Sequence, residues 1–592
     1  MLNLICTTVL IEKSPQALPL GAACVASAIK NSSKTKELFS PCVLEFCLES
    51  EEIKSLVSSI GPGQVKNASG LHTGRYIAQK IASQKPDAVL MSIFVWNHII
   101  LEECARELKK ICPKVLIIAG GPETTANPFN FEGIDFTVAG TGEGAVPELL
   151  FKLVEAEFFA KDFSYKNNAV LFSEFNIPGV FYLGGKNLSQ SNMDRMKNFS
   201  RTIPLPPEKL SSPYLDGTIN IENYDGVLWE LARGCPFKCS YCYESKGEDH
   251  VSYFPMERLE KELELFSSKK IAQAFVLDPT YNANQERAIK MLDLIRQKAP
   301  EMFFYFEARA EFIDRKLAKA FSCINCALQI GLQSSDEKVL EKVHRTIDKK
   351  KFIKNIGFLN EAGVVFGFDL IYGLPGDNLK GFKNSIDFAL SLYPNNLELF
   401  CLSILPGTKL ADDAKKFGIV WERTPPYHVI STPEFSESDL EKAARLARAT
   451  NLFYTQGRAV SWFNCILYHL KSKPSVFLDK FEKFLHQGKV TLSPQPSPSE
   501  IRKIQKDFVA MEFKKQKMDK FLPVVFDLIE LYGALSDADG EGKTSIIKLN
   551  YSPESLLSEY AQDLPFFIST QNPRRNKTKV FPTPAGADFT IL

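Results

Sequence analysis

The feature that most constrains the fold is a repeated alternation of short apolar runs with amphipathic helical stretches. It occupies two blocks of the 592-residue chain, over residues 1–150 and 226–410. Such alternation favours parallel sheets covered by helices, because a parallel neighbouring strand is reached only through a crossover connection. Two α/β units are therefore expected, and a chain of this length is too long for a single core.

In the first block, strands are expected at residues 3–10, 88–94, 115–119 and 136–139, with helices such as 21–30 and 100–110 between them. Two of these strands run into glycine turns, Gly120-Gly121-Pro122-Glu123 and Gly140-Thr141-Gly142-Glu143-Gly144. In a doubly wound sheet the ligand crevice lies beyond the carboxyl ends of the strands, and glycine lets the backbone approach a ligand closely. The alternative, tight turns that hold no ligand, stays open.

The second block predicts strands at 227–231, 274–277, 303–306, 326–332, 364–370 and 397–402, with helices at 256–267 and 285–298. Six or so βα units favour a full or partial β/α barrel, whose chemistry sits at the carboxyl ends of its strands. Helical periodicity dominates beyond about residue 430, as at 437–453 and 475–486. The expected α/β architecture therefore has four segments: a doubly wound parallel sheet over 1–184, a proline-rich linker over 185–225, a partial β/α barrel over 226–430, and a mainly helical region over 431–592.

The net charge, the amino end and the cysteine content argue against nucleic-acid binding, export and a membrane span. With 71 Lys and Arg against 70 Asp and Glu, the net charge of +1 provides no basic field of the kind that drives non-specific binding to nucleic acid. The apolar amino end lacks the basic lead and cleavage site of an export signal, and no apolar run is long enough to span a bilayer. We expect a cytoplasmic protein whose 13 cysteines stay reduced and free for metal ligation.

One cysteine loop carries the strongest chemical signal. The sequence Leu231-Ala-Arg-Gly-Cys235-Pro-Phe-Lys-Cys239-Ser-Tyr-Cys242 places three thiols in one short loop after an expected strand. Three thiolates on a [4Fe–4S] cubane leave one iron open to another ligand. The alternatives are a structural zinc site or three unrelated thiols. Zinc normally takes four protein ligands in paired spacing, and the nearest histidine, His250, follows eight residues on.

Cys323 and Cys326 form a second Cys-x-x-Cys pair. It leads directly into an apolar run and no further pair accompanies it. Because a buried thiol behaves as a small hydrophobic group, these cysteines are interpreted as packing residues and not as ligands of a second cluster.

The Cys235-x3-Cys239-x2-Cys242 spacing resembles that of the radical S-adenosylmethionine (SAM) superfamily. In that family the open iron binds the amino and carboxylate groups of SAM, and electron transfer cleaves the sulfonium to give a 5′-deoxyadenosyl radical. The cofactors carry this chemistry while the protein positions them. The resemblance implies that the three cysteines bind the cluster and that Tyr241 lies against the adenine.

Later strand ends match the segments with which the family holds SAM. Asp278 is the candidate contact for the SAM amino group, in place of the more usual Gly-Gly-Glu. Glu307 and Arg309 end the third strand and imply contacts to ribose or carboxylate. The other implied contacts are Gln333 and Ser334, in a segment followed by Arg345, and Gly373 and Leu374 near the adenine. Each alone is also explained as a strand-end cap.

A doubly wound domain joined to such a barrel resembles the cobalamin-binding domain of class B radical SAM enzymes. The matching pieces are Pro19-Leu-Gly21, Ser92-Ile-Phe94 and the two glycine turns. The resemblance implies cobalamin contacts at Ser92, Gly120, Gly121, Glu123, Gly140, Gly142 and Glu143. The Asp-x-His-x-x-Gly motif that supplies a cobalt ligand is absent, and His98 is interpreted as a surface or packing residue. Either cobalt has no protein histidine or the domain is a scaffold without cobalamin.

The two resemblances imply a cobalamin-dependent radical SAM enzyme, with methyl transfer to an unactivated carbon as the commonest chemistry of the architecture. One SAM would methylate cobalt and another would yield the radical. A first alternative is a radical SAM enzyme that catalyses cyclisation, rearrangement or thiolation. A second is a non-catalytic iron–sulfur or zinc protein.

The resemblance also implies partners. We expect a small-molecule or peptide substrate and a reductant such as flavodoxin or ferredoxin, with no membrane and no nucleic acid. The expected substrate contacts are Trp229, Tyr243, Glu244 and Tyr281.

Overall fold

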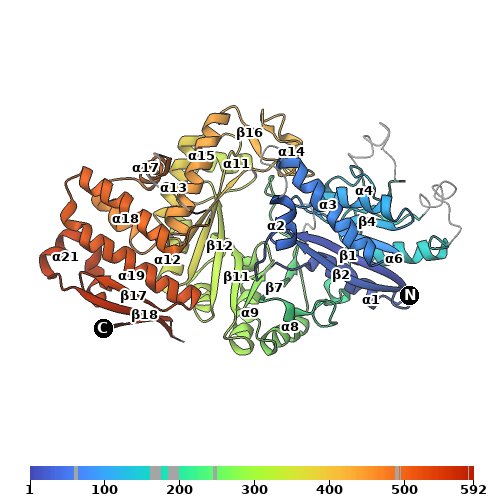
Figure 1. Cartoon of the computed structure of the whole chain (residues 1–592), viewed down its shortest axis with the longest axis horizontal. Coiled ribbons are helices and arrows are strands. Elements are labelled where there is room, and N and C mark those ends of the chain that lie inside the picture. Colours follow the sequence, from blue (N-terminus) through green and yellow to red (C-terminus); the bar gives the residue numbers. More distant parts are fainter. Residues whose placement is uncertain are drawn as a thin grey trace.

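The computed structural model describes residues 1–15, 17–58, 65–160, 175–184, 199–244, 250–486, 493, 495–583 and 586–592. Three parts follow one another along the long axis of the molecule (Figure 1): an amino-terminal sheet, a central sheet and a carboxyl-terminal region of helices. Part of the expected linker, residues 185–198, lies outside the described residues.

The amino-terminal sheet has six strands in the order β2-β1-β3-β4-β5-β6. Neighbouring strands run parallel except for β6, which is antiparallel to β5. The strands are β1 (Leu2–Leu10), β2 (Phe39–Cys47), β3 (Ala88–Ser92), β4 (Leu116–Gly120), β5 (Phe136–Val138) and β6 (Val180–Tyr182). Since β1 lies between β2 and β3, the sheet is doubly wound, and the crevice of such a sheet lies at the carboxyl ends of these central strands.

Helices cover both faces of this sheet, as the doubly wound expectation requires (Figure 1). Helices α1 (Leu20–Asn31) and α6 (Gly142–Glu155) contact each other on one face, and α3 (Val65–Ser83) and α4 (His98–Ile111) contact each other on the other. The shorter helices are α2 (Glu51–Ser58) and α5 (Pro122–Ala126), the second of which begins directly after the first glycine turn.

The central sheet has six parallel strands in the order β14-β13-β12-β11-β10-β7. They are β7 (Gly226–Trp229), β10 (Gln273–Val276), β11 (Phe303–Ala308), β12 (Cys326–Gln333), β13 (Val365–Tyr372) and β14 (Asn396–Cys401). The connecting helices are α8 (Met256–Ser268), α9 (Gln285–Lys298), α10 (Arg315–Phe321), α11 (Glu337–Lys342), α12 (Lys349–Ala362) and α13 (Leu379–Leu390). Among the described residues no ladder joins β14 to β7, so the sheet is a partial barrel.

Several short elements lie between or after the strands of the central sheet. They are β8 (Ala232–Arg233), paired with β9 (Ser252–Tyr253), the helical turns η6 (Tyr281–Ala283) and η7 (Ala310–Phe312), helix α14 (Lys409–Asp413), and the hairpin β15 (Val420–Trp421) with β16 (Val429–Ser431).

The described part of the expected linker packs tightly between the two sheets. It contains the turns η3 (Pro207–Lys209) and η4 (Ile221–Asn223), and Tyr214 and Ile219 are each 5% exposed. Both belong to the same apolar core as Leu20 of α1 and Val227 of β7. Residues 199–225 therefore join the two sheets through a shared core.

The carboxyl-terminal region packs helices against one edge of the central sheet and ends in a small antiparallel sheet (Figure 1). Its helices are α15 (Glu437–Thr450), η8 (Asn451–Thr455), α16 (Phe463–Leu470), α17 (Pro474–His486), α18 (Pro498–Lys515), η9 (Asp519–Phe521), α19 (Leu522–Glu541), α20 (Pro553–Leu557), η10 (Glu559–Gln562) and α21 (Leu564–Thr570). Its strands are β17 (Ser545–Leu549), β18 (Asn576–Thr583) and β19 (Gly586–Ile591). Among the helices in the described ranges, none is both long and apolar enough to cross a membrane.

Candidate active site

The three cysteines of the predicted cluster loop lie close together, just after β8. Cys239 is 7% exposed, and Cys235 and Cys242 are partly exposed. Burial raises the pKa of the Cys242 thiol to about 11, with further contributions from Cys239 and Cys235. Burial and Cys239 likewise raise the pKa of Cys235. This mutual influence shows that the three thiols occupy one small volume, and the binding of a metal cluster must displace their protons.

Hydrogen bonds from the barrel fix both ends of this loop. Asp278, which follows β10, accepts the backbone N–H groups of Leu231 at 2.8 Å and Ala232 at 3.0 Å through Oδ1. The backbone N–H of Ser240 donates to the carbonyl oxygen of Val343, which follows α11, at 3.0 Å. The loop is therefore held by two different βα units.

A guanidinium lies directly against the loop. Arg345 donates to the hydroxyl of Tyr241 at 3.5 Å and to the carbonyl oxygen of Gly331, and it interacts with the thiol of Cys239. A fixed positive charge beside a cysteine favours the thiolate form that binds iron.

A second arginine supports the outer side of the loop. The guanidinium of Arg309 lies 3.7 Å from the ring centroid of Phe237, the residue between Cys235 and Cys239 in the loop. Arg309 also pairs with Glu311 at 3.0 Å and is 8% exposed. The predicted SAM contact at Arg309 stays a prediction, because in this structure the guanidinium is engaged with the loop and with Glu311.

The donor set fits a cubane cluster. Within the described ranges, no three His, Cys, Asp or Glu side chains converge on one point as ligands of a single metal ion would. A cubane needs no such convergence, because each thiolate binds a different iron. All thirteen cysteines are described and none forms a disulfide, so the loop thiols are available as ligands.

Gln333 offers an open acceptor beside this loop. Its backbone has a φ of +66° at an irregularity in the β12–β13 ladder, a conformation that non-glycine residues rarely adopt. Its Nε2 lies 2.5 Å from the point where a Cβ on Gly331 would sit, and its buried Oε1 has no partner among the described residues. An orphaned acceptor near Arg345 and Tyr241 fits a ligand with donor groups, as SAM has.

The other predicted SAM contacts divide into two groups. Glu307 is exposed near the end of β11, and partial loss of water together with the nearby Asp369 and Glu244 raises its pKa to about 7. Ser334 is 1% exposed and its hydroxyl accepts the N–H of Asp336 at 3.1 Å, while Leu374 is fully buried. Gly373 has a φ of +89°, and a Cβ there would lie 2.6 Å from Val429. The structure therefore leaves Glu307 exposed and places Gln333 near Tyr241 and Arg345, whereas Ser334 and Leu374 are buried within the protein.

Changing Asp278 to Asn should flatten the pH dependence of stability. Burial raises the pKa of Asp278 to about 7, although the two backbone hydrogen bonds oppose the shift. The folded chain thus retains a proton that the unfolded chain releases above about pH 4, so this residue costs stability increasingly as pH rises from about 4 to 7, on the order of 3 kcal/mol. Asn keeps the Oδ1 acceptor, and urea unfolding of the metal-free variant and parent at pH 5 and pH 7.5 measures the difference. A difference that is the same at both pH values would contradict the assignment.

In the amino-terminal sheet, the glycine turns behave differently from one another. A Cβ on Gly120, the last residue of β4, would meet no atom within 4 Å. Gly121 has a φ of +101°, and a Cβ there would lie 2.6 Å from the carbonyl oxygen of Ile93. Gly140 has a φ of +112° and abuts Thr202, whose Oγ1 would lie 2.3 Å from such a Cβ. Gly121 and Gly140 are therefore required by the protein's own packing, whereas Gly120 faces open space that fits a bound cobalamin.

The two carboxylates predicted to contact cobalamin, Glu123 and Glu143, form contacts with side chains of the central region, and their contact with cobalamin stays a prediction. Glu123 is 5% exposed and accepts the hydroxyl of Tyr427 at 2.8 Å, and its Oε2 lies 2.7 Å from Nδ1 of His98. Glu143 pairs with Arg233 at 2.7 Å. Sequence patterns give no signal for Tyr427, which lies 304 residues from Glu123.

Other groups near the turns remain available to a ligand. The Oδ1 of Asn127, after α5, and the Oγ1 of Thr202 are buried without hydrogen-bond partners among the residues described. Ser92 ends β3 beside α1, with its Oγ 3.4 Å from the position of a Cβ on Gly21, and Gly142 begins α6. Unsatisfied buried polar atoms next to an open glycine fit a polar ligand such as a corrinoid.

The cysteine loop and the amino-terminal crevice meet at one place. The point where a Cβ on Gly407 would sit lies 3.3 Å from Ala126, the last residue of α5, and 3.6 Å from the ring of Tyr243. Tyr243 directly follows Cys242, and its pKa is raised to about 12 by burial, with Glu123 contributing. Gly407 therefore lies against both Tyr243 and α5, and Thr125 and Glu123 of α5 are near enough to Tyr243 to affect its pKa.

Comparisons with known proteins agree with this arrangement. Residues 229–389 match the radical SAM superfamily, and residues 63–150 match the B12 binding domain. The cobalamin-dependent radical SAM methyltransferase TokK of Streptomyces tokunonensis is 26% identical over 357 residues, which cover 55% of this chain and 48% of that protein. The 2-(S-pantetheinyl)-carbapenam-3-carboxylate methyltransferase of Streptantibioticus cattleyicolor is 25% identical over 388 residues, covering 60% and 52%. The chain thus spans about half the length of these relatives.

Solved structures show the same fold at low identity. The cobalamin-dependent SAM radical enzyme OxsB with aqua-cobalamin bound matches 97% of this chain and 85% of its own, with a TM-score of 0.53 and 13% identity. The radical SAM methyltransferase TsrM of Kitasatospora setae, with cobalamin and a [4Fe–4S] cluster bound, matches 72% of this chain and 76% of its own, with a TM-score of 0.50 and 16% identity. The chain therefore contains a segment that matches the B12 binding domain, followed by a segment that matches the radical SAM superfamily, in the order that the sequence analysis predicts.

Proposed function

We propose that this chain is a cobalamin-dependent methyltransferase that acts on an unactivated carbon of a small molecule. The observation that carries the proposal is the closeness of the cysteine loop to α5, seen where Gly407 lies against both Ala126 and Tyr243. Methyl transfer to a carbon radical requires the methyl carrier and the source of the radical to reach one substrate. When bound, the cluster supplies the electron that cleaves SAM, and cobalamin carries the methyl group.

The chain's own residues hold and orient these groups. Cys235, Cys239 and Cys242 supply the thiolates, and Arg345 keeps a positive charge beside Cys239. The free Oε1 of Gln333 accepts a donor group of SAM. We assign Glu307 the role of a second SAM or substrate contact, since it lies exposed near Asp369 and Glu244 with a pKa raised to about 7 and can hold a proton at neutral pH.

We propose a small-molecule substrate, because the name of one relative specifies a carbapenam. Carboxyl and amide groups from β12 and β13 line the barrel interior, where the Nε2 of Gln329 donates to Asp369 at 2.6 Å. Burial raises the pKa of Asp369 to about 6, and Glu398 adds to the shift. We also propose a cytoplasmic location, where the cysteines stay reduced.

Labelled SAM tests the proposal. Anaerobically reconstituted protein with cobalamin, dithionite and methyl-deuterated SAM is expected to form 5′-deoxyadenosine, S-adenosylhomocysteine and a product that carries the label. Carbapenams with a pantetheine arm are the first substrates to try. Formation of 5′-deoxyadenosine with no transferred label from any candidate would favour cyclisation, rearrangement or thiolation. Absence of SAM cleavage would overturn the radical assignment.

A further inference from the structure

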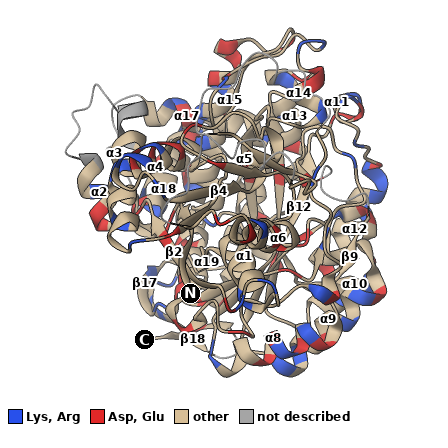
Figure 2. Cartoon of the chain, turned by 90° about the vertical axis from the view of Figure 1, so that its right-hand side faces the viewer, with Lys and Arg blue, Asp and Glu red and all other residues tan. Residues whose placement is uncertain are grey.

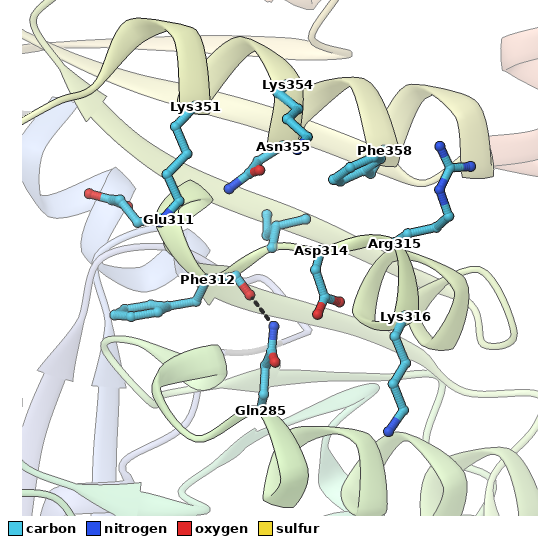
Figure 3. Close-up of a pocket in the computed structure, with 11 residues that line it drawn as sticks. Gln285, Glu311, Phe312, Asp314, Arg315, Lys316, Lys351, Lys354, Asn355 and Phe358 are labelled. Carbon is cyan, nitrogen blue, oxygen red and sulfur yellow. Dashed lines mark hydrogen bonds between the residues drawn. The ribbon is translucent and has the colours of Figure 1, made fainter.

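A pocket lined by several lysine and arginine side chains lies beside α10 and α12 (Figure 3). Its volume is about 530 Å³, and it lies between the segment after β11 and the first turns of α12. Four cationic side chains and two carboxylates line it: Arg315, Lys316, Lys351, Lys354, Glu311 and Asp314. Arg315 is paired with Glu361 at 2.9 Å, so the positive charge of the pocket wall comes from Lys316, Lys351 and Lys354.

The carboxylates near the pocket are already engaged. Glu311 pairs with Arg309 at 3.0 Å, and Asp314 accepts the N–H of Leu317 at 2.8 Å as the N-cap of α10. Lys351 and Lys354, in contrast, form no ion pair with any acidic side chain that the structure describes. Two uncompensated ammonium groups thus lie at the pocket wall formed by α12.

The positive charge extends beyond the pocket. Lys349 and Lys350 begin α12, and Lys238 is exposed within the cysteine loop itself. In Figure 2, Lys and Arg are coloured blue on α10 and α12 at the right of that view, whereas α11 carries both acidic and basic residues. Because the whole chain has a net charge of +1, this concentration is a local property of one surface and not a general one.

Only one layer of side chains separates the pocket from the loop. Phe312, in the pocket wall, has its ring centroid 6.0 Å from that of Phe237, which lies between Cys235 and Cys239 in the sequence. The Arg309 partner of Glu311 lies over the other part of the same ring, at 3.7 Å. A molecule seated in the pocket would therefore contact the outer shell of the predicted cluster.

We propose that this basic surface, comprising Lys238, Lys316, Lys351 and Lys354, is the docking site for an acidic one-electron donor protein of the flavodoxin type. The inference rests on the proposed function, because reductive cleavage of SAM needs an external electron. In the step, the donor loses one electron and the cluster gains it, with no atom transferred. Complementary charge steers association and fixes the orientation of the partner, which places its flavin on the cluster side of the barrel.

Charge reversal on α12 tests the surface. The reconstituted double variant Lys351→Glu/Lys354→Glu is compared with the parent and with Lys503→Glu/Lys514→Glu, a matched reversal of two exposed lysines on α18. Binding of a reduced bacterial flavodoxin is measured directly, and cluster reduction is followed by electron paramagnetic resonance. At low ionic strength the α12 variant should bind and be reduced at least about tenfold more weakly, whereas the α18 variant should match the parent.

Two comparisons make the result specific. Reduction by dithionite should be the same in all three proteins, and raising the salt should weaken the parent's binding toward that of the α12 variant. Equal flavodoxin binding by parent and α12 variant at low salt would overturn the proposal, as would saturable competition by inorganic pyrophosphate, which would identify a small-anion site instead. Failure of the proposed function is separate: the parent would then yield no 5′-deoxyadenosine even with dithionite.

Discussion

Changing Cys239 to Ala will abolish SAM cleavage while leaving the fold intact. Cys239 is the most buried of the three loop cysteines and interacts with Arg345, so its loss removes one of three iron ligands and one of the partners of the guanidinium. Reductive formation of 5′-deoxyadenosine should fall by more than about 100-fold, since even changes outside the ligand set of a metal site cost 10–100-fold. Iron and sulfide analysis, the absorption of the reconstituted protein and chromatography of 5′-deoxyadenosine measure the effect.

The matched control is Cys323→Ala. Cys323 is exposed, and its thiol donates to the carbonyl oxygen of Lys319 at 3.2 Å, whereas Cys326 is buried at the start of β12. This variant should retain full iron content and activity. A Cys239→Ala protein with an undiminished cluster that still cleaves SAM would remove the basis of the assignment.

Changing Gly120 to Leu will eliminate cobalamin binding without unfolding the protein. Among the described residues other than its chain neighbours, no atom lies within 4 Å of the position its Cβ would take, and its φ is not positive, so the backbone accepts a side chain there without strain. It would, however, fill the space at the end of β4 where the crevice of the doubly wound sheet opens. The corrinoid absorption retained after desalting should drop at least about tenfold, because an overfilled site costs several kcal/mol at a close contact.

Gly357→Leu is the control for added bulk, because Gly357 on α12 also has no atom within 4 Å of a Cβ position. Both variants should melt within a few degrees of the parent, as followed by circular dichroism. Iron content should also be unchanged in both. Retention of cobalamin by the Gly120→Leu protein would show that the corrinoid is held elsewhere.

Elements with buried, regular apolar runs were predictable from sequence. Helix α9 spans Gln285–Lys298 as its periodicity indicates, and β12 begins at Cys326 as expected. Strand β2 was not predicted from the sequence. It lies at the sheet edge and most of its residues are only partly buried, so the run from Phe39 to Cys47 lacks a strand-like apolar pattern. Its place is decided by backbone pairing with β1, which no single stretch of sequence records.

In the candidate site, too, the local features were predictable from sequence and the long-range contacts were not. The cysteine loop is local in sequence, and its spacing alone predicts three neighbouring thiols. The contacts that fix it are distant: Ser240 bonds to Val343, and Asp278 to Leu231. Asp278 was identified because it ends a strand, yet its use as an acceptor for the loop backbone follows from the approach of β7 to β10, which only the fold provides.

The ion pair between Arg233 and Glu143 has a mechanical consequence. Arg233 lies two residues before Cys235, and its guanidinium also binds Glu230 at 2.8 Å. A rotation of the amino-terminal domain that displaces Glu143 therefore also displaces Arg233 and the start of the cysteine loop. A chimaera that takes its amino-terminal domain from a relative would thus disturb the cysteine loop unless the relative has a carboxylate at the position of Glu143.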